Sequence, residues 1–186
     1  MIYPVILKDR DILLRPFDAG DINAHYEAAV ESIDTVYPWL PWCHPGYQKH
    51  ESRTWVESRR KEWELGLSYD FVIADPHDRT FIGACALNGL FRDQVYANLG
   101  YWVRASRTRR GFATAASRLL IDFGFNTLKL KRIEIVIAAG NGPSVRVAEK
   151  LGAVKEGVLR NRLVTAYGVS DAVMYSLVPQ DGGKSA

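Results

Sequence analysis

The sequence of 186 residues predicts a single mixed α/β domain, and two segments predict it most directly. Tyr96–Val103 has the composition of a strand and leads through a short basic turn into a helical pattern of apolar residues. Residues 131–137 form a second strand pattern, followed by a helix that ends near Gly152. One domain accounts for the length, because domains commonly contain about 50–250 residues.

The N-terminal part of the chain predicts a hairpin and then a helix. Residues 4–7 and 12–17 have strand composition and are joined by a polar turn at 8–11. Asp18 suits the N-cap of a helix over residues 19–32, because its carboxylate can accept hydrogen bonds from the first free N–H groups.

A second helix is expected over Lys49–Leu65, ending at Gly66. Its charged residues predict a solvated face, so Trp55 and Trp63 are expected to anchor the helix in the core rather than to contact a ligand. Further strands are expected at residues 70–74, 80–90, 95–103, 154–163 and 169–177, with a turn at 91–94.

The basic turn before the central helix is a candidate pyrophosphate site. Its residues are Arg109, Arg110, Gly111, Phe112, Ala113 and Thr114. The first N–H groups of a helix have no partner within it and carry the positive end of the helix dipole. Gly111 and Ala113 would let phosphates approach the backbone, and the arginines would supply charge. An ordinary helix start fits this turn about equally well.

The helix that follows residues 131–137 has clear start and stop signals. Asn141 or Gly142 suits its N-cap, Pro143 suits the first helical position and Gly152 suits the end. Ser144 then lies in the first turn, where its hydroxyl could also do no more than bind a backbone N–H.

These strand–turn–helix units, taken in order, resemble the GNAT superfamily of acetyl-CoA-dependent N-acetyltransferases. Within it, the chain resembles the RimJ/RimL group, which acetylates protein N-termini, notably those of ribosomal proteins. The matching motifs run through nearly the whole chain: Leu13-Leu14-Arg15-Pro16, Leu40-Pro41-Trp42, Leu99-Gly100-Tyr101-Trp102, Arg110-Gly111-Phe112-Ala113-Thr114, Asn141-Gly142-Pro143-Ser144, Glu149-Lys150-Leu151-Gly152 and Glu156-Gly157.

The resemblance implies the GNAT fold, an α/β domain whose central, mostly antiparallel, splayed sheet is flanked by helices. It implies this domain for residues 1–179, with 180–186 as a polar tail. In the family, the strand before the pyrophosphate turn carries a bulge and diverges from the next strand, and pantetheine adds to its backbone. The implied cofactor is acetyl-CoA, bound through the main chain of Tyr101, Trp102 and Val103 and through the turn described above.

The resemblance also points to a partner for the leaving thiolate. Many family members use a tyrosine on the second helix, at a position that is Ala148 here. The RimJ/RimL alternative is a serine, which corresponds to Ser144. Ser144 is therefore the expected catalytic residue, and Asn141 is expected to orient pantetheine or to cap the helix.

No general base is evident. The glutamate that RimJ/RimL enzymes often carry in the central strand is Asn98 here, and a second family position falls near Leu163. Glu156 matches the family but can be structural, and His44 is a lone loop histidine. A free α-amine has a pKa of about 7.7–8.0 and a lysine about 10.4, so the missing carboxylate favours α-amine acceptors.

The loop over residues 36–47 has three prolines, two tryptophans and two tyrosines, an unusual composition for a plain connection. Tyr37, Trp39 and Trp42 are expected to line the acceptor site, as the resemblance implies for this loop. The alternative is a packed loop that closes one end of the core.

The composition gives little support for a nucleic-acid or membrane role. A net charge of +3 is too small to indicate a polynucleotide partner, and coenzyme A explains the local cluster of Arg104, Arg107, Arg109, Arg110 and Arg118. No run of about 18 apolar residues occurs, and residues 1–9 do not resemble a signal peptide. Cys43 and Cys85 are expected to be free thiols of a cytoplasmic protein with no metal site.

Three functions fit the sequence. The leading one is acetylation of a protein N-terminus, ribosomal proteins first, by an enzyme that can be a homodimer. The second is acetylation of a small amine such as an antibiotic, polyamine or amino-acid derivative. The third is a non-catalytic acyl-CoA-binding module, which the missing base leaves open.

Overall fold

A computed structural model describes residues 4–91 and 95–179. Within them one sheet of eight strands runs in the order β1-β2-β3-β4-β5-β6-β8-β7. The strands are β1 (Leu7–Lys8), β2 (Leu13–Pro16), β3 (Tyr69–Ala74), β4 (Phe81–Phe91), β5 (Tyr96–Val103), β6 (Arg132–Ala138), β7 (Val154–Thr165) and β8 (Gly168–Leu177). The predicted mixed α/β class with a mostly antiparallel sheet flanked by helices is confirmed.

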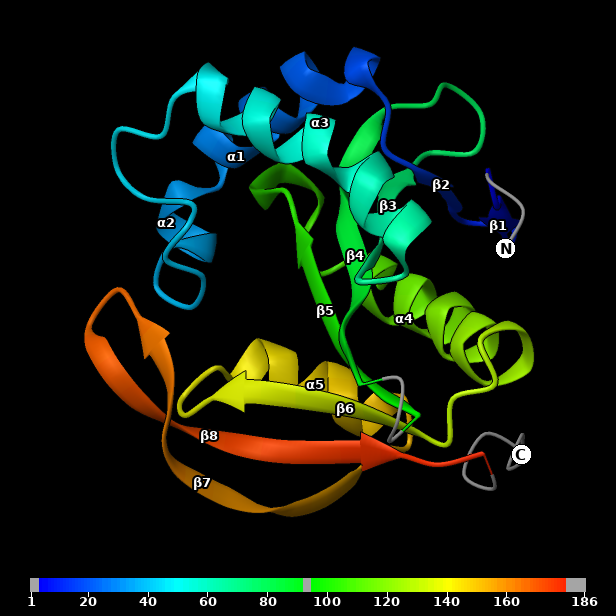
Figure 1. The fold of residues 1–186 in the computed structure, drawn as a ribbon. Helices are drawn as coiled ribbons and strands as arrows, with labels where there is room; N and C mark the ends of the chain where they lie inside the picture. Colours follow the sequence, from blue (N-terminus) through cyan, green and yellow to red (C-terminus); the bar gives the residue numbers. More distant parts are fainter. Residues whose placement is uncertain (1–3, 92–94, 180–186) are drawn as a thin grey trace.

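Helices cover the sheet on both faces (Figure 1). They are η1 (Ala19–Asp21), α1 (Ile22–Glu31), α2 (Ile33–Val36), α3 (Lys49–Leu65), η2 (Ala105–Arg107), α4 (Phe112–Asp122), the π-helical turn η3 (Phe123–Thr127) and α5 (Gly142–Lys150). α1, α2 and α3 lie together on one side of β3–β5, and α4 lies on the other side. No helix of the described residues is long and apolar enough to span a membrane.

The sheet consists of two halves, β1–β5 and β6–β8, which pair with each other over one short segment and then diverge. β5 is antiparallel to β4 as far as Val103, and β6 is antiparallel to β8 from Ile133 to Ala138. Between the halves, β5 and β6 are parallel and pair only where Tyr96–Asn98 meets Arg132–Glu134. Each half follows its own partner strands and twists with them, so the halves diverge after Asn98. The expected splay is confirmed.

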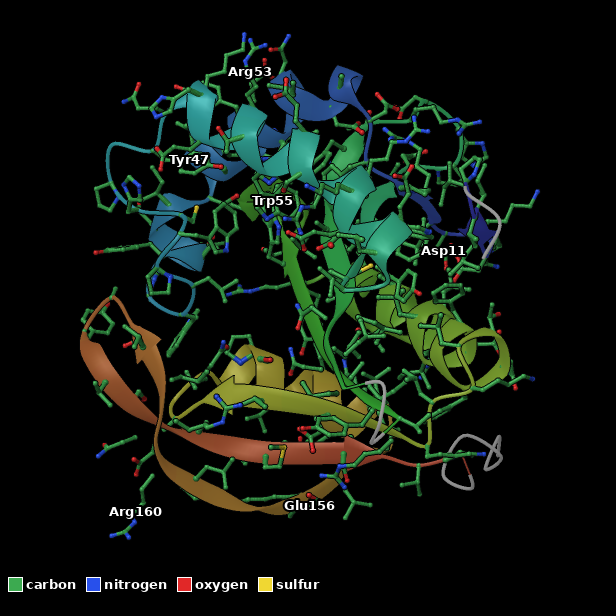
Figure 2. All side chains as sticks on the ribbon, in the orientation of Figure 1. Asp11, Tyr47, Arg53, Trp55, Glu156 and Arg160 are labelled. Carbon is green, nitrogen blue, oxygen red and sulfur yellow. The ribbon has the colours of Figure 1, made fainter. Side chains whose placement is uncertain are left out.

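Two apolar clusters hold the helices to the sheet. One contains Phe71, Leu99 and Phe123 with residues of α4, on one face of the sheet. The other contains Phe17, Val72 and residues of α1 and α3, on the opposite face. Trp63 is buried in the first cluster, and Trp55 packs against the second. Both tryptophans therefore lie where the sequence predicted, and Figure 2 shows Trp55 on the inner side of α3.

The N-terminal elements differ in detail from the prediction. β1 and β2 are shorter than the expected strands at 4–7 and 12–17. Asp18 does cap a helix, but the first turn over Ala19–Asp21 is a 3₁₀ turn, because Asp21 reaches back to bind the Asp18 N–H at 2.9 Å. The short α2 was not predicted.

The expected bulge lies on a different strand. The pairing of β4 with β5 shifts between Asn88 and Phe91, so the extra residue belongs to β4 rather than to β5. Gly89 adopts a positive φ of 57° there, which a glycine tolerates. Residues 1–3 of the N-terminus, most of the turn at 91–94 and the tail at 180–186 lie outside the described residues.

Candidate active site

The C-terminal half of β5 has a free edge. From Leu99 to Val103, no pairing of described residues joins β5 to β6, while the other edge stays bonded to β4. Side chains alternate along a strand, so Asn98 and Trp102 face α1–α3, whereas Tyr101 faces α4 and α5. This edge offers main-chain donors and acceptors to an extended ligand, as an edge strand does to a peptide.

The N-terminus of α4 lies just beyond this strand and is open to an anion. Arg109 and Gly111 have positive φ angles of 62° and 87°, and no side chain of the described residues caps the helix. A Cβ on Gly111 would meet no heavy atom within 4 Å, so the space beside this helix end is open. These N–H groups and the helix dipole suit a pyrophosphate.

A groove of about 370 Å³ extends from this helix end toward the end of α5. Arg110, Arg118 and Lys150 line it, and Asp9 and Asp11 of the β1–β2 turn lie on its other side. Arg118 donates to the Lys150 carbonyl at 3.3 Å, so α4 and α5 are joined at this end. The three cations suit further phosphate charge.

Arg104 does not belong to the free basic cluster. Its guanidinium donates to the Glu31 carboxylate on α1, and Glu31 also accepts from the Ser106 N–H at 2.7 Å. These hydrogen bonds hold the pKa of Glu31 down at about 2. The expected basic patch is therefore corrected, because the charge of Arg104 is used to fasten the turn before α4 to α1.

The start of α5 is capped as the sequence predicted. Asn141 Oδ1 accepts from the Ser144 N–H at 3.2 Å, and Pro143 lies in the first turn. Because Asn141 supplies the cap, the Ser144 hydroxyl is not needed for it.

The Ser144 hydroxyl instead contacts β5 across the splay. Its Oγ lies 2.8 Å from the Tyr101 hydroxyl, which also lies 3.3 Å from the Ser144 carbonyl oxygen. Burial raises the pKa of Tyr101 to about 12, so Tyr101 is a neutral hydrogen-bond donor at physiological pH. The hydroxyl of Tyr101 on β5 and the hydroxyl of Ser144 on α5, which are far apart in the sequence, thus meet beside the free edge of β5.

The aromatic loop over residues 36–47 borders the opening between β5 and β6 from the side of α1–α3. The Trp42 ring lies 5.4 Å from the Trp102 ring of β5. Trp39 extends to the turn before α5, where a Cβ on Gly140 would lie 3.9 Å from its ring. Tyr37 lies at the C-cap of α2, and among the described residues no side-chain hydrogen bond or ring contact joins it to β5 or α5. Two of the three predicted acceptor residues therefore border the splay.

His25 of α1 is buried among these rings and was not predicted as part of the site. It stacks between Trp42 and Trp55, with ring centroids 5.8 and 4.9 Å away. Ser52 donates to the Tyr47 hydroxyl at 3.1 Å, so its oxygen accepts from His25 Nδ1 at 2.9 Å. Burial lowers the pKa of His25 to about 4, and the ring is therefore neutral at pH 7.

No carboxylate takes the place of the missing family glutamate. Asn98 donates to Asn88 Oδ1 at 3.1 Å, and among the described residues its own Oδ1 is buried without a hydrogen-bond partner. Glu134 is in register with Asn98 on the next strand, but its carboxylate accepts from Arg132 Nε at 2.8 Å. The Glu134 carboxylate is therefore paired with Arg132 rather than free beside Asn98.

The two other candidate bases are also committed to partners. Glu156 accepts from Arg132 and from the Ser176 hydroxyl, which lower its pKa to about 2. It lies on β7, far from the aromatic loop (Figure 2). His44 faces acceptors at both ring nitrogens, Glu51 at 3.0 Å and the Pro45 carbonyl at 3.1 Å. These contacts raise the pKa of His44, and both of its ring nitrogens already have partners.

Cys43 and Cys85 are free, as expected, and both are buried. Burial raises the pKa of the Cys43 thiol to about 11, so neither its position nor its ionisation suggests a nucleophile.

Residues 11–154 match the family model described as an acetyltransferase (GNAT) domain. A Bacillus subtilis (strain 168) protein named as a ribosomal N-acetyltransferase, YdaF, is 34% identical over 177 residues, which cover 91% of this chain and 92% of that protein.

Solved structures show the same fold. Mycobacterium smegmatis RimJ in complex with a CoA-disulfide matches with a TM-score of 0.90 at 25% identity, over 98% of this chain and 91% of that one. RimL, a ribosomal α-N-protein acetyltransferase solved with coenzyme A, matches with a TM-score of 0.86 over 94% of this chain and 98% of that one. At 19% identity, the likeness to RimL is one of fold.

Proposed function

The chain belongs to the GNAT acetyltransferase family, and from this premise we propose that it acetylates the N-terminal α-amine of a protein, with ribosomal proteins as the first candidates. It is an acyltransferase that uses acetyl-CoA, which supplies an acetyl group as a reactive thioester. The name of the 34% identical relative YdaF, a ribosomal N-acetyltransferase, supports the protein substrate.

The residues around the splay fit acetyl-CoA in three places. The free edge of β5 at Tyr101, Trp102 and Val103 would bind pantetheine through the main chain, and a backbone N–H there would polarise the thioester carbonyl. Arg109, Arg110 and the N–H groups of Gly111, Phe112, Ala113 and Thr114 would bind the pyrophosphate. Asn141 would hold the start of α5 in place.

Ser144 would act on the leaving thiolate. Its hydroxyl is free of helix capping and lies beside the free edge of β5. A hydrogen bond to sulfur strengthens as negative charge develops there, so it would stabilise the transition state more than the bound thioester.

The proposal of an α-amine acceptor is supported mainly by the absence, among the described residues near β5, of a free carboxylate that could act as a base. Glu134, in register with Asn98, and Glu156 on β7 are both bound to Arg132, and the pKa of Glu156 is lowered to about 2. At pH 7.5, about a quarter or more of an α-amine with a pKa of 7.7–8.0 is neutral, against about 0.1% of a lysine at 10.4. An enzyme without a strong base would therefore use α-amines. Trp39 and Trp42 would line the acceptor site; Tyr37, also predicted there, would lie further from it.

A competition assay tests this function. We expect a peptide with a free N-terminal Ser, Ala or Thr and no lysine to react about a hundredfold faster at pH 7.5 than a matched peptide with a blocked N-terminus and one lysine. Large rings leave little room for a long first side chain, so small N-terminal residues should react best. Thiol release measured for both peptides, and for spermidine and an aminoglycoside, gives kcat/KM for each.

The pH profile is the control for that assay. Without an enzyme base, the rate with the lysine peptide should rise about tenfold per pH unit from 7 to 9, whereas the rate with the α-amine should level off above pH 8. A wide preference for spermidine or the aminoglycoside would replace the protein substrate with a small amine.

We further propose a cytoplasmic protein with a single catalytic domain over residues 1–179 and a separate polar tail. Binding of nucleic acid is not part of the proposal, because the basic residues are accounted for by acetyl-CoA and by the Glu31 ion pair. A homodimer stays a prediction.

A further inference from the structure

The position of the Tyr101 hydroxyl is not explained by the role of the Tyr101 main chain in binding pantetheine. Tyr101 was singled out for its main chain, yet its side chain crosses the splay to the first turn of α5 and ends 2.8 Å from Ser144 Oγ. Ala148, on the same helix, has no functional group. The only hydroxyl pair that the described contacts show across the splay therefore joins Tyr101 to Ser144.

We propose that Tyr101 is a positioning residue for the leaving thiolate: its hydroxyl donates to Ser144 Oγ and thereby directs the Ser144 hydrogen toward sulfur. This inference rests on the proposed role of Ser144. The Tyr101 hydroxyl acts through Ser144 and touches no reacting atom.

Either hydroxyl can donate in the 2.8 Å contact between Tyr101 and Ser144 Oγ, so donation by Tyr101 is part of the inference. A phenol has one hydrogen, and its two acceptors are Ser144 Oγ at 2.8 Å and the Ser144 carbonyl at 3.3 Å. The 2.8 Å contact has the length of a good O–H···O hydrogen bond, and it fits donation from Tyr101 to Ser144 Oγ. With Oγ accepting from Tyr101, the Ser144 hydrogen is free to point away, into the splay.

The pair would stabilise the thiolate without donating a proton to it. A thiol ionises near pH 8.5, far below a serine hydroxyl or the Tyr101 phenol, whose pKa burial raises to about 12. Both hydroxyls therefore keep their hydrogens. The proton that the amine loses and the proton that sulfur gains are exchanged with water. Two linked hydroxyls polarise each other, so the Ser144 hydrogen bond is stronger with Tyr101 than without it.

A double-mutant cycle of Tyr101→Phe and Ser144→Ala tests the inference. Phenylalanine keeps the ring that packs on the core and removes only the hydroxyl. We expect Tyr101→Phe to lower kcat about tenfold, with the affinity for acetyl-CoA unchanged, and to have no further effect in the Ser144→Ala background. Tyr167→Phe, at an 82% exposed tyrosine of the β7–β8 turn, is the matched control and should behave as wild type.

A second readout does not depend on turnover. Titration of bound coenzyme A, followed by thiolate absorbance near 240 nm against the free enzyme, reports the pKa of the thiol in the site. We expect this pKa to lie below that of free coenzyme A in the wild type and to rise by about one unit in Tyr101→Phe, which corresponds to a tenfold change. Thermal melting and calorimetric acetyl-CoA affinity establish that the variant is folded and binds normally.

The outcomes separate this inference from the function on which it rests. An equal loss in both backgrounds, or weaker acetyl-CoA binding with no change in thiol pKa, would make the pair a structural link between β5 and α5 and overturn the inference. A normal Tyr101→Phe beside an impaired Ser144→Ala would also overturn it, while leaving Ser144 as the thiolate's partner. If both variants react normally, the proposed role of Ser144 fails as well.

Discussion

Gly111→Glu is expected to abolish detectable acetyl-CoA binding, with a loss of affinity of about a hundredfold or more. The new carboxylate would occupy the open space beside the α4 N-terminus and repel the pyrophosphate, and like charges brought together cost several kcal/mol. Isothermal titration calorimetry on the folded variant measures the loss.

Gly168→Glu is the matched control for this change. Gly168 has a positive φ of 99°, close to that of Gly111, and a Cβ there also meets no heavy atom within 4 Å. It therefore carries the same backbone strain at a turn far along the chain from α4. Unchanged acetyl-CoA affinity in folded Gly111→Glu would contradict the placement of the pyrophosphate.

Ser144→Ala is expected to lower kcat by roughly ten- to a thousandfold, because loss of one strong transition-state hydrogen-bond donor costs up to about a thousandfold. The affinity for acetyl-CoA should stay within about threefold of the wild type, because the hydrogen bond forms fully only as charge develops on sulfur. Steady-state kinetics with the preferred acceptor and calorimetry with acetyl-CoA give the two numbers.

The controls for Ser144→Ala follow from the geometry of the cap. Asn141 caps α5 through the backbone N–H of residue 144, which alanine retains, so the melting temperature should change little. Wild-type turnover in this variant would show that the hydroxyl has no part in the reaction.

Much of the fold was predictable because its signals are local. Gly66 ends α3 in the left-handed conformation, and Asn141 caps α5, as residue type and spacing indicated. The strand–turn–helix around Gly111 was predicted within a residue at its boundaries. Each of these features depends on neighbours in the sequence.

The errors came from contacts between distant residues. The bulge lies on β4 because the register between β4 and β5 shifts between Asn88 and Phe91. Strand composition does not reveal such a register shift. Arg104 looked like part of an anion site until the fold brought Glu31 beside it.

The site was half predictable for the same reason. Ser144 and the pyrophosphate turn follow from motifs, whereas the Tyr101 hydroxyl meets Ser144 only because β5 and β6 diverge and α5 fills the gap. His25 carried no motif, and it is buried and neutral because rings from several elements, Trp42 and Trp55 among them, pack around it.

The central claim is that acetyl-CoA lies along the free edge of β5 with its pyrophosphate on the α4 N-terminus. Amide hydrogen exchange, measured by mass spectrometry with and without acetyl-CoA, tests it most directly. We predict slower exchange in peptides that cover residues 99–103 and 111–115, no change in β7 and β8, and protection of 111–115 alone by ADP. Protection by acetyl-CoA that leaves both of these segments unchanged would contradict the account.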